Sequence, residues 1–288
     1  MSYKTTLKKY FLIIEKINRG TYPNMKDIRT KLDNFDLSCS QRTIERYIEA
    51  IRDEFGIEII YNTYRKGYYI DKENSLDFDS YFNFLKFSQE ANLLVETLRD
   101  GQNACKYIHF DADPNRTGIE FLKPLLRAIK DQQVVHLTYR SFNKIENKSF
   151  RFKPELLKEY MYRWYVIGFA SYAEQPRVYA LDRIQDCFVS SMKFDRKLGD
   201  ADEVFGDIIG VNFSGDKIEK IVLSFTPFQG NYIRSMPMHR SQEIITDNES
   251  EFRIAIRVKP NMELKQKIQM YGTEVEVVEP IGLLDSIG

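Results

Sequence analysis

The sequence of 288 residues is poor in the residue types that build disulfide frameworks and metal centres. It has three cysteines and one tryptophan, and Cys39, Cys105 and Cys187 form no CxxC pair. Reduced thiols in the cytoplasm are therefore expected. No run of 18 apolar residues occurs, which excludes a membrane-spanning helix. The first residues lead into a charged amphipathic helix, which argues against a secretory leader.

Recognisable catalytic motifs are also missing. His109, His136 and His239 stand in unrelated contexts without metal-ligand spacing, and neither a glycine-rich phosphate loop nor a GxSxG elbow occurs. Asp111 and Asp113 lie in a predicted loop and are interpreted as turn formers rather than as an acid/base pair. We therefore expect a protein that is not an enzyme and that needs no metal or cofactor.

What the sequence does contain is a globular composition with a segregated charge. Hydrophobic residues make up 43% and aromatic residues 14% of the chain, enough for two or three domains. The net charge of zero hides blocks of +4 (residues 1–72), −4 (73–118), +6 (119–198) and −6 (199–288). Chance variation among ordinary solvated surfaces is one explanation of these charged blocks. The other is that both basic blocks bind polyanions such as nucleic acids.

A capped amphipathic helix is predicted in the first basic block. Ser40 is a suitable N-cap and Gly56 a suitable left-handed end. The apolar stripe of this helix consists of Ile44, Ile48, Ile51 and Phe55. The opposite face consists of Gln41, Arg42, Glu45, Arg46 and Glu49. One face is therefore expected in a core and the other in solvent or on a ligand.

The surrounding pattern predicts a winged helix-turn-helix that reads duplex DNA. Two helices precede, the first over Leu7–Ile17 and the second capped by Asn24, and the strands 58–61 and 67–70 follow. Solvated faces of a small helical domain remain the alternative. The residues expected on DNA are Ser40, Gln41, Arg42, Thr43 and Arg46 of the helix, with Arg65 and Lys66 of the hairpin.

Residues 73–118 are predicted to form a helical connector with acidic flanks. Its apolar positions run from Phe78 to Leu98, its helix ends at Asp100–Gly101, and a short strand is expected over 107–110. An interdomain spacer and a dimer contact both fit this pattern.

Two further domains are predicted. Residues 119–198 read as one short helix followed by five strands, which favours a small barrel. The strands are expected at 134–140, 149–157, 164–171, 177–181 and 187–193. Residues 199–288 show the order strand 218–225, helix 229–234, hairpin 241–246 with 251–258, helix 260–271 and strand 274–278. This is the β-α-β-β-α-β order of a ferredoxin-like domain, and its acidic balance favours dimerisation or control of access to the barrel.

Several motifs together resemble the WYL-domain transcriptional regulators of bacteria. The Trp-Tyr-Leu strand that names this family is similar to Trp164-Tyr165-Val166. Arg151-Phe152-Lys153-Pro154, Leu181-Asp182-Arg183-Ile184 and the helix from Ser40 to Arg46 also resemble it, and Tyr271–Val277 resembles the end of the family's C-terminal extension. The departures are Val166 in place of leucine and Tyr47, where relatives often have aspartate.

The resemblance implies a ligand-controlled DNA-binding protein. Its middle domain would be an Sm-like, SH3-type barrel that senses a nucleic-acid-derived ligand, such as single-stranded DNA or a nucleotide. The residues to which the sensing role is carried over are Tyr139, Ser141, Arg151, Arg163, Arg177 and Arg183. Trp164 is interpreted as core packing. An ion pair between Arg183 and Asp182 is the structural alternative for Arg183.

The complete prediction is an α+β, multidomain protein. Its parts are a winged helix-turn-helix (1–72), a connector (73–118), a WYL barrel (119–198) and a ferredoxin-like extension (199–288). The expected partners are a double-stranded DNA operator, a nucleic-acid-derived effector and a second copy of the chain. An RNA- or single-strand-binding protein that uses the barrel without transcriptional control is the alternative, but such a protein has little use for a winged helix.

Overall fold

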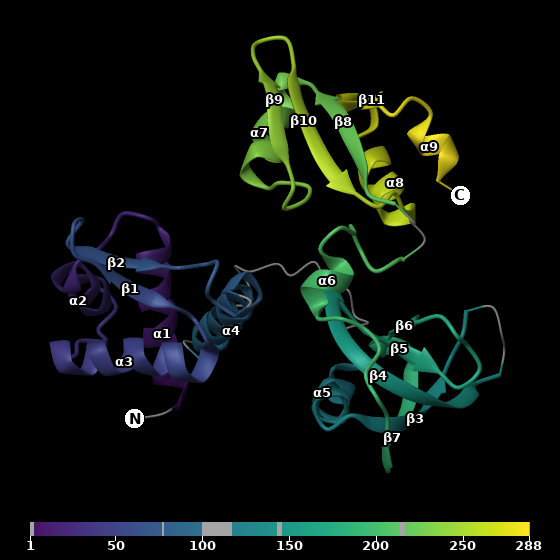
Figure 1. Ribbon diagram of the computed structural model, residues 1–288, viewed down its shortest axis with the longest axis horizontal. Helices are drawn as coiled ribbons and strands as arrows, with labels where there is room; N and C mark the ends of the chain where they lie inside the picture. The colour runs from purple at the N-terminus through teal and green to yellow at the C-terminus, as the bar shows by residue number, and fades with distance from the viewer. Residues whose placement is uncertain (1–2, 77, 100–116, 143–145, 214–216, 288) are drawn as a thin grey trace. The chain divides into compact units, whose positions relative to one another are not determined.

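The computed structural model describes residues 3–76, 78–99, 117–142, 146–213 and 217–287. The chain divides into two compact units, residues 1–111 and 112–288, whose elements are labelled in Figure 1. Helices and strands occur in both units, and the described strands form sheets of two, four and five strands. The predicted α+β, multidomain content is therefore confirmed, whereas the four-part division at residues 72, 118 and 198 stays a prediction.

The first unit consists of helices and one hairpin. Its elements are α1 (Tyr3–Asn18), α2 (Met25–Asp33), α3 (Gln41–Phe55), β1 (Ile59–Asn62), β2 (Gly67–Ile70) and α4 (Phe78–Arg99). The predicted caps are present. Asn24 and Asp27 form a reciprocal capping box on α2. On α3, the hydroxyl of Ser40 accepts a hydrogen bond from the Thr43 amide, and Gly56 ends the helix at φ 64°.

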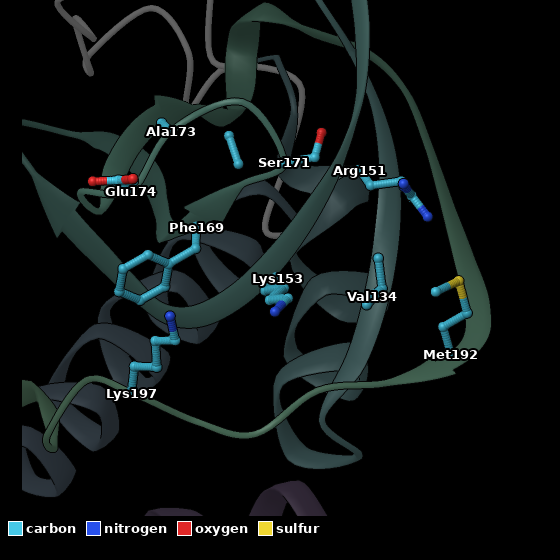
Figure 2. Close-up of a pocket in the computed structure, with 10 residues that line it drawn as sticks. Val134, Arg151, Lys153, Phe169, Ser171, Ala173, Glu174, Met192 and Lys197 are labelled. Carbon is cyan, nitrogen blue, oxygen red and sulfur yellow. The ribbon is translucent and has the colours of Figure 1, made fainter.

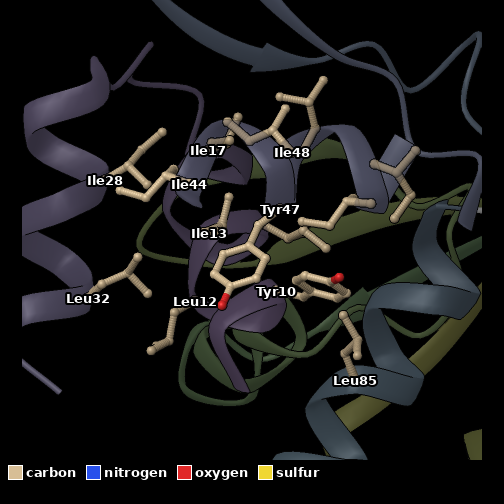
Figure 3. Packing of buried hydrophobic residues seen from close by; sticks show 14 of the residues in the cluster. Tyr10, Leu12, Ile13, Ile17, Ile28, Leu32, Ile44, Tyr47, Ile48 and Leu85 are labelled. Atoms are coloured by element: carbon tan, nitrogen blue, oxygen red, sulfur yellow. The ribbon is translucent and has the colours of Figure 1, made fainter. Parts of the chain in front are cut away.

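The core of this unit lies among α1, α2 and α3 (Figure 3), and both Ile13 and Ile44 are fully buried in it. Tyr47 also belongs to this core, where its ring meets the edge of Tyr10 at 5.5 Å between centroids. Because Tyr47 points into the core and not to the exposed face of α3, a bulky aromatic side chain fits at this position. The departure from the family pattern at Tyr47 therefore contributes to packing of the core.

The start of the predicted connector packs into the same core. Phe78 and Leu85 of α4 are buried there, and Phe82 stacks on Phe11 with centroids 5.8 Å apart. The first turns of α4 are therefore part of the first unit. The predicted helix end at 100–101 and the predicted strand 107–110 lie outside the described residues.

A five-stranded antiparallel sheet forms the first half of the second unit. Its strands are β3 (Gln133–Tyr139), β4 (Lys148–Tyr160), β5 (Arg163–Ala170), β6 (Arg177–Ala180) and β7 (Ile184–Lys193), in the order β6-β5-β4-β3-β7. The short helices η2 (Ile119–Phe121), α5 (Leu122–Lys130) and η3 (Leu181–Arg183) accompany it. Leu125 of α5 and Phe152 of β4 are fully buried in the common core.

Two strand boundaries in this sheet differ from the predicted ones. β7 begins three residues before the predicted strand 187–193, because Asp186 pairs with Thr138 and Ile184 with Tyr139 across a bulge. One extra residue in a bulge bends a strand without ending it. Glu159 lies inside β4, and the turn follows at Met161 and Tyr162, which adopt positive φ angles of 49° and 63°.

A four-stranded antiparallel sheet forms the second half. It contains β8 (Glu219–Phe225), β9 (Glu243–Asp247), β10 (Phe252–Val258) and β11 (Val275–Glu279) in the order β11-β8-β10-β9. The accompanying helices are α7 (Pro227–Ser235), α8 (Met262–Gln269), η4 (Gly272–Glu274) and α9 (Leu283–Ser286). The element order agrees with the predicted β-α-β-β-α-β pattern within about two residues at most boundaries.

A segment that we call the strap, residues 194–213 with α6 (Ala201–Phe205), makes hydrogen bonds to both halves of the second unit. The buried carboxylate of Glu155 accepts hydrogen bonds from the amides of Lys197 and Leu198, at 2.9 and 2.7 Å. Lys158 donates to the carbonyl of Gly210 at 2.6 Å. From the four-stranded half, the buried Asn261 side chain donates to the carbonyl groups of Ile209 and Asn212.

Lys158 is expected to make the second unit more stable as the pH rises from 8 to 9. Burial lowers the pKa of its ammonium group from 10.5 to about 8, against a smaller opposing effect of the Glu263 carboxylate. Above pH 8 Lys158 therefore binds more protons in the unfolded chain than in the folded one, and its contribution to the free energy of unfolding rises with pH. The rise should be a fraction of the about 1.4 kcal/mol per pH unit that one full proton contributes.

The measurement is urea unfolding at pH 8 and pH 9, followed by the fluorescence of Trp164, the single tryptophan of the chain. Lys158→Met keeps an apolar chain over the Phe205 ring, which lies 3.9 Å from Nζ, but has no proton to lose. The increase in the free energy of unfolding from pH 8 to pH 9 should therefore be smaller in this variant than in the wild type. Equal changes in both proteins would contradict the lowered pKa.

Candidate nucleic-acid and ligand sites

The outer face of α3 presents two arginines one helical turn apart. Arg42 and Arg46 are exposed, and neither makes an ion pair among the described residues. The acidic residue between them, Glu45, accepts a hydrogen bond from the side chain of Gln41 at 2.9 Å. The described part of the chain therefore gives the two guanidinium groups no acidic partner, although two glutamates share their face. The hydroxyl groups of Ser40 and Thr43 lie 2.9 Å apart at the start of the helix.

The hairpin β1–β2 is held against the turn before α2. The amide of Tyr68 donates to the carbonyl of Pro23 at 2.9 Å, and Arg65 lies over the ring of Tyr22 at 4.4 Å. Gly67 makes this approach possible, since a Cβ atom there would lie 1.8 Å from the Tyr22 carbonyl oxygen. Arg65 and Lys66, both predicted DNA contacts, are exposed at the tip.

Tyr64 is the tip residue that sequence analysis missed. Its side chain is 93% exposed, the highest value among the large hydrophobic residues of the first unit whose burial is described. The adjacent amide of Arg65 is fixed by the side chain of Asn62 at 2.8 Å, so the turn itself is ordered. An aromatic residue directly before two cations was the available signal, because basic and aromatic side chains together favour nucleic acid.

The six predicted ligand residues do not form one site. Tyr139, Arg177 and Arg183 line a cleft of about 460 Å³, which we call the tyrosine–arginine cleft. Its other lining residues are Tyr165, Pro176, Val178, Ala180, Val211, Asn212 and Phe213. The last three belong to the strap, which therefore forms one wall.

Arg183 and Tyr139 are positioned by each other and by the backbone. Arg183 donates through Nε to the carbonyl of Arg140 at 3.0 Å, and its guanidinium lies 4.8 Å from the centroid of the Tyr139 ring. The Tyr139 hydroxyl accepts a hydrogen bond from the Ala180 amide at 3.3 Å. Burial raises the pKa of Tyr139, and burial likewise raises the pKa of Tyr165. Both phenols therefore stay neutral and can donate hydrogen bonds at physiological pH.

The remaining predicted residues lie elsewhere. Asp182 forms its ion pair with Arg163, whereas an ion pair with the adjacent Arg183 had been the alternative considered. Ser141 is half-buried just after β3 and is not among the residues that line the tyrosine–arginine cleft. Trp164 is half-buried against the core of the five-stranded sheet, which agrees with its interpretation as a packing residue.

Arg151 belongs to a second and larger cleft of about 610 Å³, which we call the arginine–lysine cleft. Figure 2 shows Lys197 beside the ring of Phe169, Lys153 in the middle of the cleft and Arg151 farther along. The lining is completed by Val134, Ala170, Ser171, Ala173, Glu174 and Met192. Lys153, Phe169 and Lys197 were missed by sequence analysis. Lys153 could have been found, because residues two apart in a strand share a face with Arg151.

Metal and membrane sites were also searched for. Within the ranges that the structure describes, no three His, Cys, Asp or Glu side chains are placed to hold a metal ion. None of the described helices is both long and apolar enough to span a bilayer.

Comparison with known families identifies two domains. The WYL domain family matches residues 120–189 and the WCX domain family matches residues 217–287. The chain therefore contains a WYL domain followed by a WCX domain. The five-stranded sheet lies in the first and the four-stranded sheet in the second.

Solved structures show weaker likeness. Proteasome accessory factor B/C (PafBC) of Arthrobacter aurescens is similar over 98% of this chain, with 16% identity and a TM-score of 0.32. The chain covers 46% of the PafBC chain, less than half its length. A crystal structure of a CRISPR Cas-related protein is similar over 98% of this chain and 81% of its own, with 11% identity and a TM-score of 0.40. No curated protein matches the chain.

Proposed function

We propose that the protein is a DNA-binding transcriptional regulator whose WYL domain binds a nucleic-acid-derived ligand and thereby controls operator binding. The observation that carries this proposal is the joint presence, in one chain, of a WYL domain and an α3 face with two arginines that pair with no described acidic residue, beside a basic hairpin. Each feature alone has other uses. Together they provide a surface that fits duplex DNA and a domain that fits an anionic ligand.

The order of elements in the first unit supports the proposal that this unit binds DNA. Three helices followed by a hairpin make up the order of a winged helix-turn-helix, in which the third helix enters the major groove by its N-terminal turns. Arg42 and Arg46 would then contact bases or phosphates, and the amides and hydroxyls at Ser40 and Thr43 would contact phosphate. Arg65 and Lys66 would contact the backbone next to the groove.

The lining of the tyrosine–arginine cleft supports the proposal that the WYL domain binds a nucleic-acid-derived ligand. Arg177 and Arg183 offer guanidinium groups to phosphate, while Tyr165 and Phe213 offer aromatic surface to a base. In this proposal the WYL domain is an Sm-like barrel and the WCX domain a ferredoxin-like module. The protein acts as a homodimer, since paired copies read the two half-sites of an operator.

The experiment has two stages. Duplexes are first selected from a random-sequence library with the full chain, and the expected result is an enriched operator. A single-stranded oligonucleotide or nucleotide is then titrated into the operator complex, where we expect operator affinity to change by fivefold or more. Enrichment of single strands or RNA without any duplex preference would favour the alternative, a single-strand-binding protein.

Substitution of Arg177→Gln together with Arg183→Gln is expected to abolish the effect of the oligonucleotide on operator affinity. Operator binding without effector should stay at the wild-type level, because both arginines lie outside the first unit. The matched control is Lys123→Gln with Lys130→Gln, which removes the same charge from the exposed surface of α5. An effector response that survives in the arginine variant would contradict the assignment of this cleft.

A further inference from the structure

The arginine–lysine cleft has features of a binding site, and of its lining residues the family resemblance points only to Arg151. We infer that it binds a second nucleotide unit, with a phosphate among Arg151, Lys153 and Lys197 and a base on the ring of Phe169. The inference deepens the proposed function and rests on it for the class of ligand. It adds a site whose residues are distinct from those of the tyrosine–arginine cleft.

The charge of the cleft favours an anion. Three cationic side chains line it, and none of them is ion-paired to a described residue. Glu174 is the single acidic side chain of the lining, and Figure 2 shows it at a distance from Arg151. Clustered cations without carboxylate partners repel one another, and a bound phosphate relieves that repulsion with charge-assisted hydrogen bonds.

The size and the aromatic wall favour a nucleotide over a bare phosphate ion. A volume of about 610 Å³ falls within the range of small-molecule sites and far exceeds that of a tetrahedral anion. Phe169 is half-buried, and it lies outside the core cluster of the five-stranded sheet. The Lys197 ammonium lies 5.1 Å from its ring centroid, so one ligand can contact the ring and the cation together.

The position of Lys197 is built into the fold. Glu155 is only 1% exposed, and one of its carboxylate oxygens accepts the amides of both Lys197 and Leu198. Its other oxygen is buried without a hydrogen-bond partner. A buried carboxylate is costly unless it is hydrogen-bonded, so the two amide contacts that Glu155 accepts hold the chain at Lys197 in one position. Lys153 faces Phe169 across the β4–β5 pairing, which fixes the opposite side of the cleft.

The test is the binding of a 3′-fluorescein-labelled, 5′-phosphorylated dT10 strand to the full chain by anisotropy at several salt concentrations. Lys153→Gln with Lys197→Gln should raise Kd and reduce the slope of log Kd against log salt by about 0.7, because the two lysines hold one phosphate and each neutralised phosphate on a single strand contributes about 0.7. Phe169→Leu should raise Kd by about fivefold or more at every salt concentration and leave the slope unchanged, since stacking is not ionic.

Three comparison variants and a titration with a second ligand make the result decisive. Lys123→Gln with Lys130→Gln removes equal charge elsewhere and should leave both Kd and slope unchanged, while Lys153→Arg should bind as the wild type does. Arg177→Gln with Arg183→Gln tests the other cleft, so that a failure of that site is distinguished from a failure of this one. Calorimetric titration with dTMP separates a free nucleotide from a strand, and binding of either probe supports the inference if it depends on Lys153, Lys197 and Phe169. Binding of both probes that is indifferent to these residues, or no binding at all, overturns it.

Discussion

Replacement of Arg42 and Arg46 by alanine is expected to abolish specific duplex binding. Both side chains project from the exposed face of α3 without an ion-pair partner among the described residues. Loss of two base or phosphate contacts should cost roughly 3 kcal/mol, which is about a 100-fold loss of affinity. If both arginines contact phosphate, the salt dependence should also weaken, by about 0.9 per lost contact. The measurement is a gel shift on the selected operator at fixed salt.

The fold should survive this double substitution, because neither arginine contributes to the core of the first unit. Alanine is also the best helix former at exposed positions. The control variant Lys123→Ala with Lys130→Ala lowers the net charge equally in the second unit and should keep operator affinity. Wild-type affinity in the Arg42/Arg46 variant would exclude α3 as the recognition helix.

Gly67→Ala is expected to destabilise the first unit and to weaken duplex binding together. The new Cβ would lie 1.8 Å from the carbonyl oxygen of Tyr22, so the hairpin must move away and lose the bond from Tyr68 to Pro23. Overpacking of this kind costs about 3 kcal/mol. Circular dichroism at 222 nm during urea unfolding should show an earlier transition of the first unit.

Two internal references accompany this measurement. The fluorescence of Trp164, which lies in the second unit, should report an unchanged transition there. Gly20→Ala serves as the matched variant: Gly20 has φ 70° but no atom within 4 Å of the added Cβ, so only backbone strain of about 1 kcal/mol is expected. If Gly67→Ala and Gly20→Ala shift the urea transition of the first unit equally, the close contact between Gly67 and Tyr22 does not determine the stability of the hairpin.

Local signals in the sequence predicted the elements of this protein well. The caps at Asn24, Ser40 and Gly56 involve neighbours within four residues, so their chemistry can be read directly from the sequence. The stripe of Ile44, Ile48 and Ile51 follows from helical periodicity, and all three are buried. Most strands of both sheets begin and end within two residues of their predicted bounds.

Contacts between distant segments could not be predicted in the same way. Residues of the strap line one wall of the tyrosine–arginine cleft and bring Lys197 to the other cleft, but strap and β4 are about 40 residues apart in the chain. Periodicity carries no information about such a distance. The pairing of Asp182 with Arg163 rather than with its neighbour Arg183 has the same cause, because register across β5 and β6 decides which side chains meet.

The strap also sets the smallest piece of the chain that can fold as the WYL domain. The family match ends at residue 189, before the two amides that satisfy Glu155 and before the carbonyl that accepts from Lys158. A fragment cut at that boundary would lose the strap contacts of the Glu155 carboxylate and of the Lys158 ammonium, including the Phe205 ring that covers Lys158. An autonomous fragment is therefore expected to extend at least to Gly210, and the strap is as much a part of the domain as its strands.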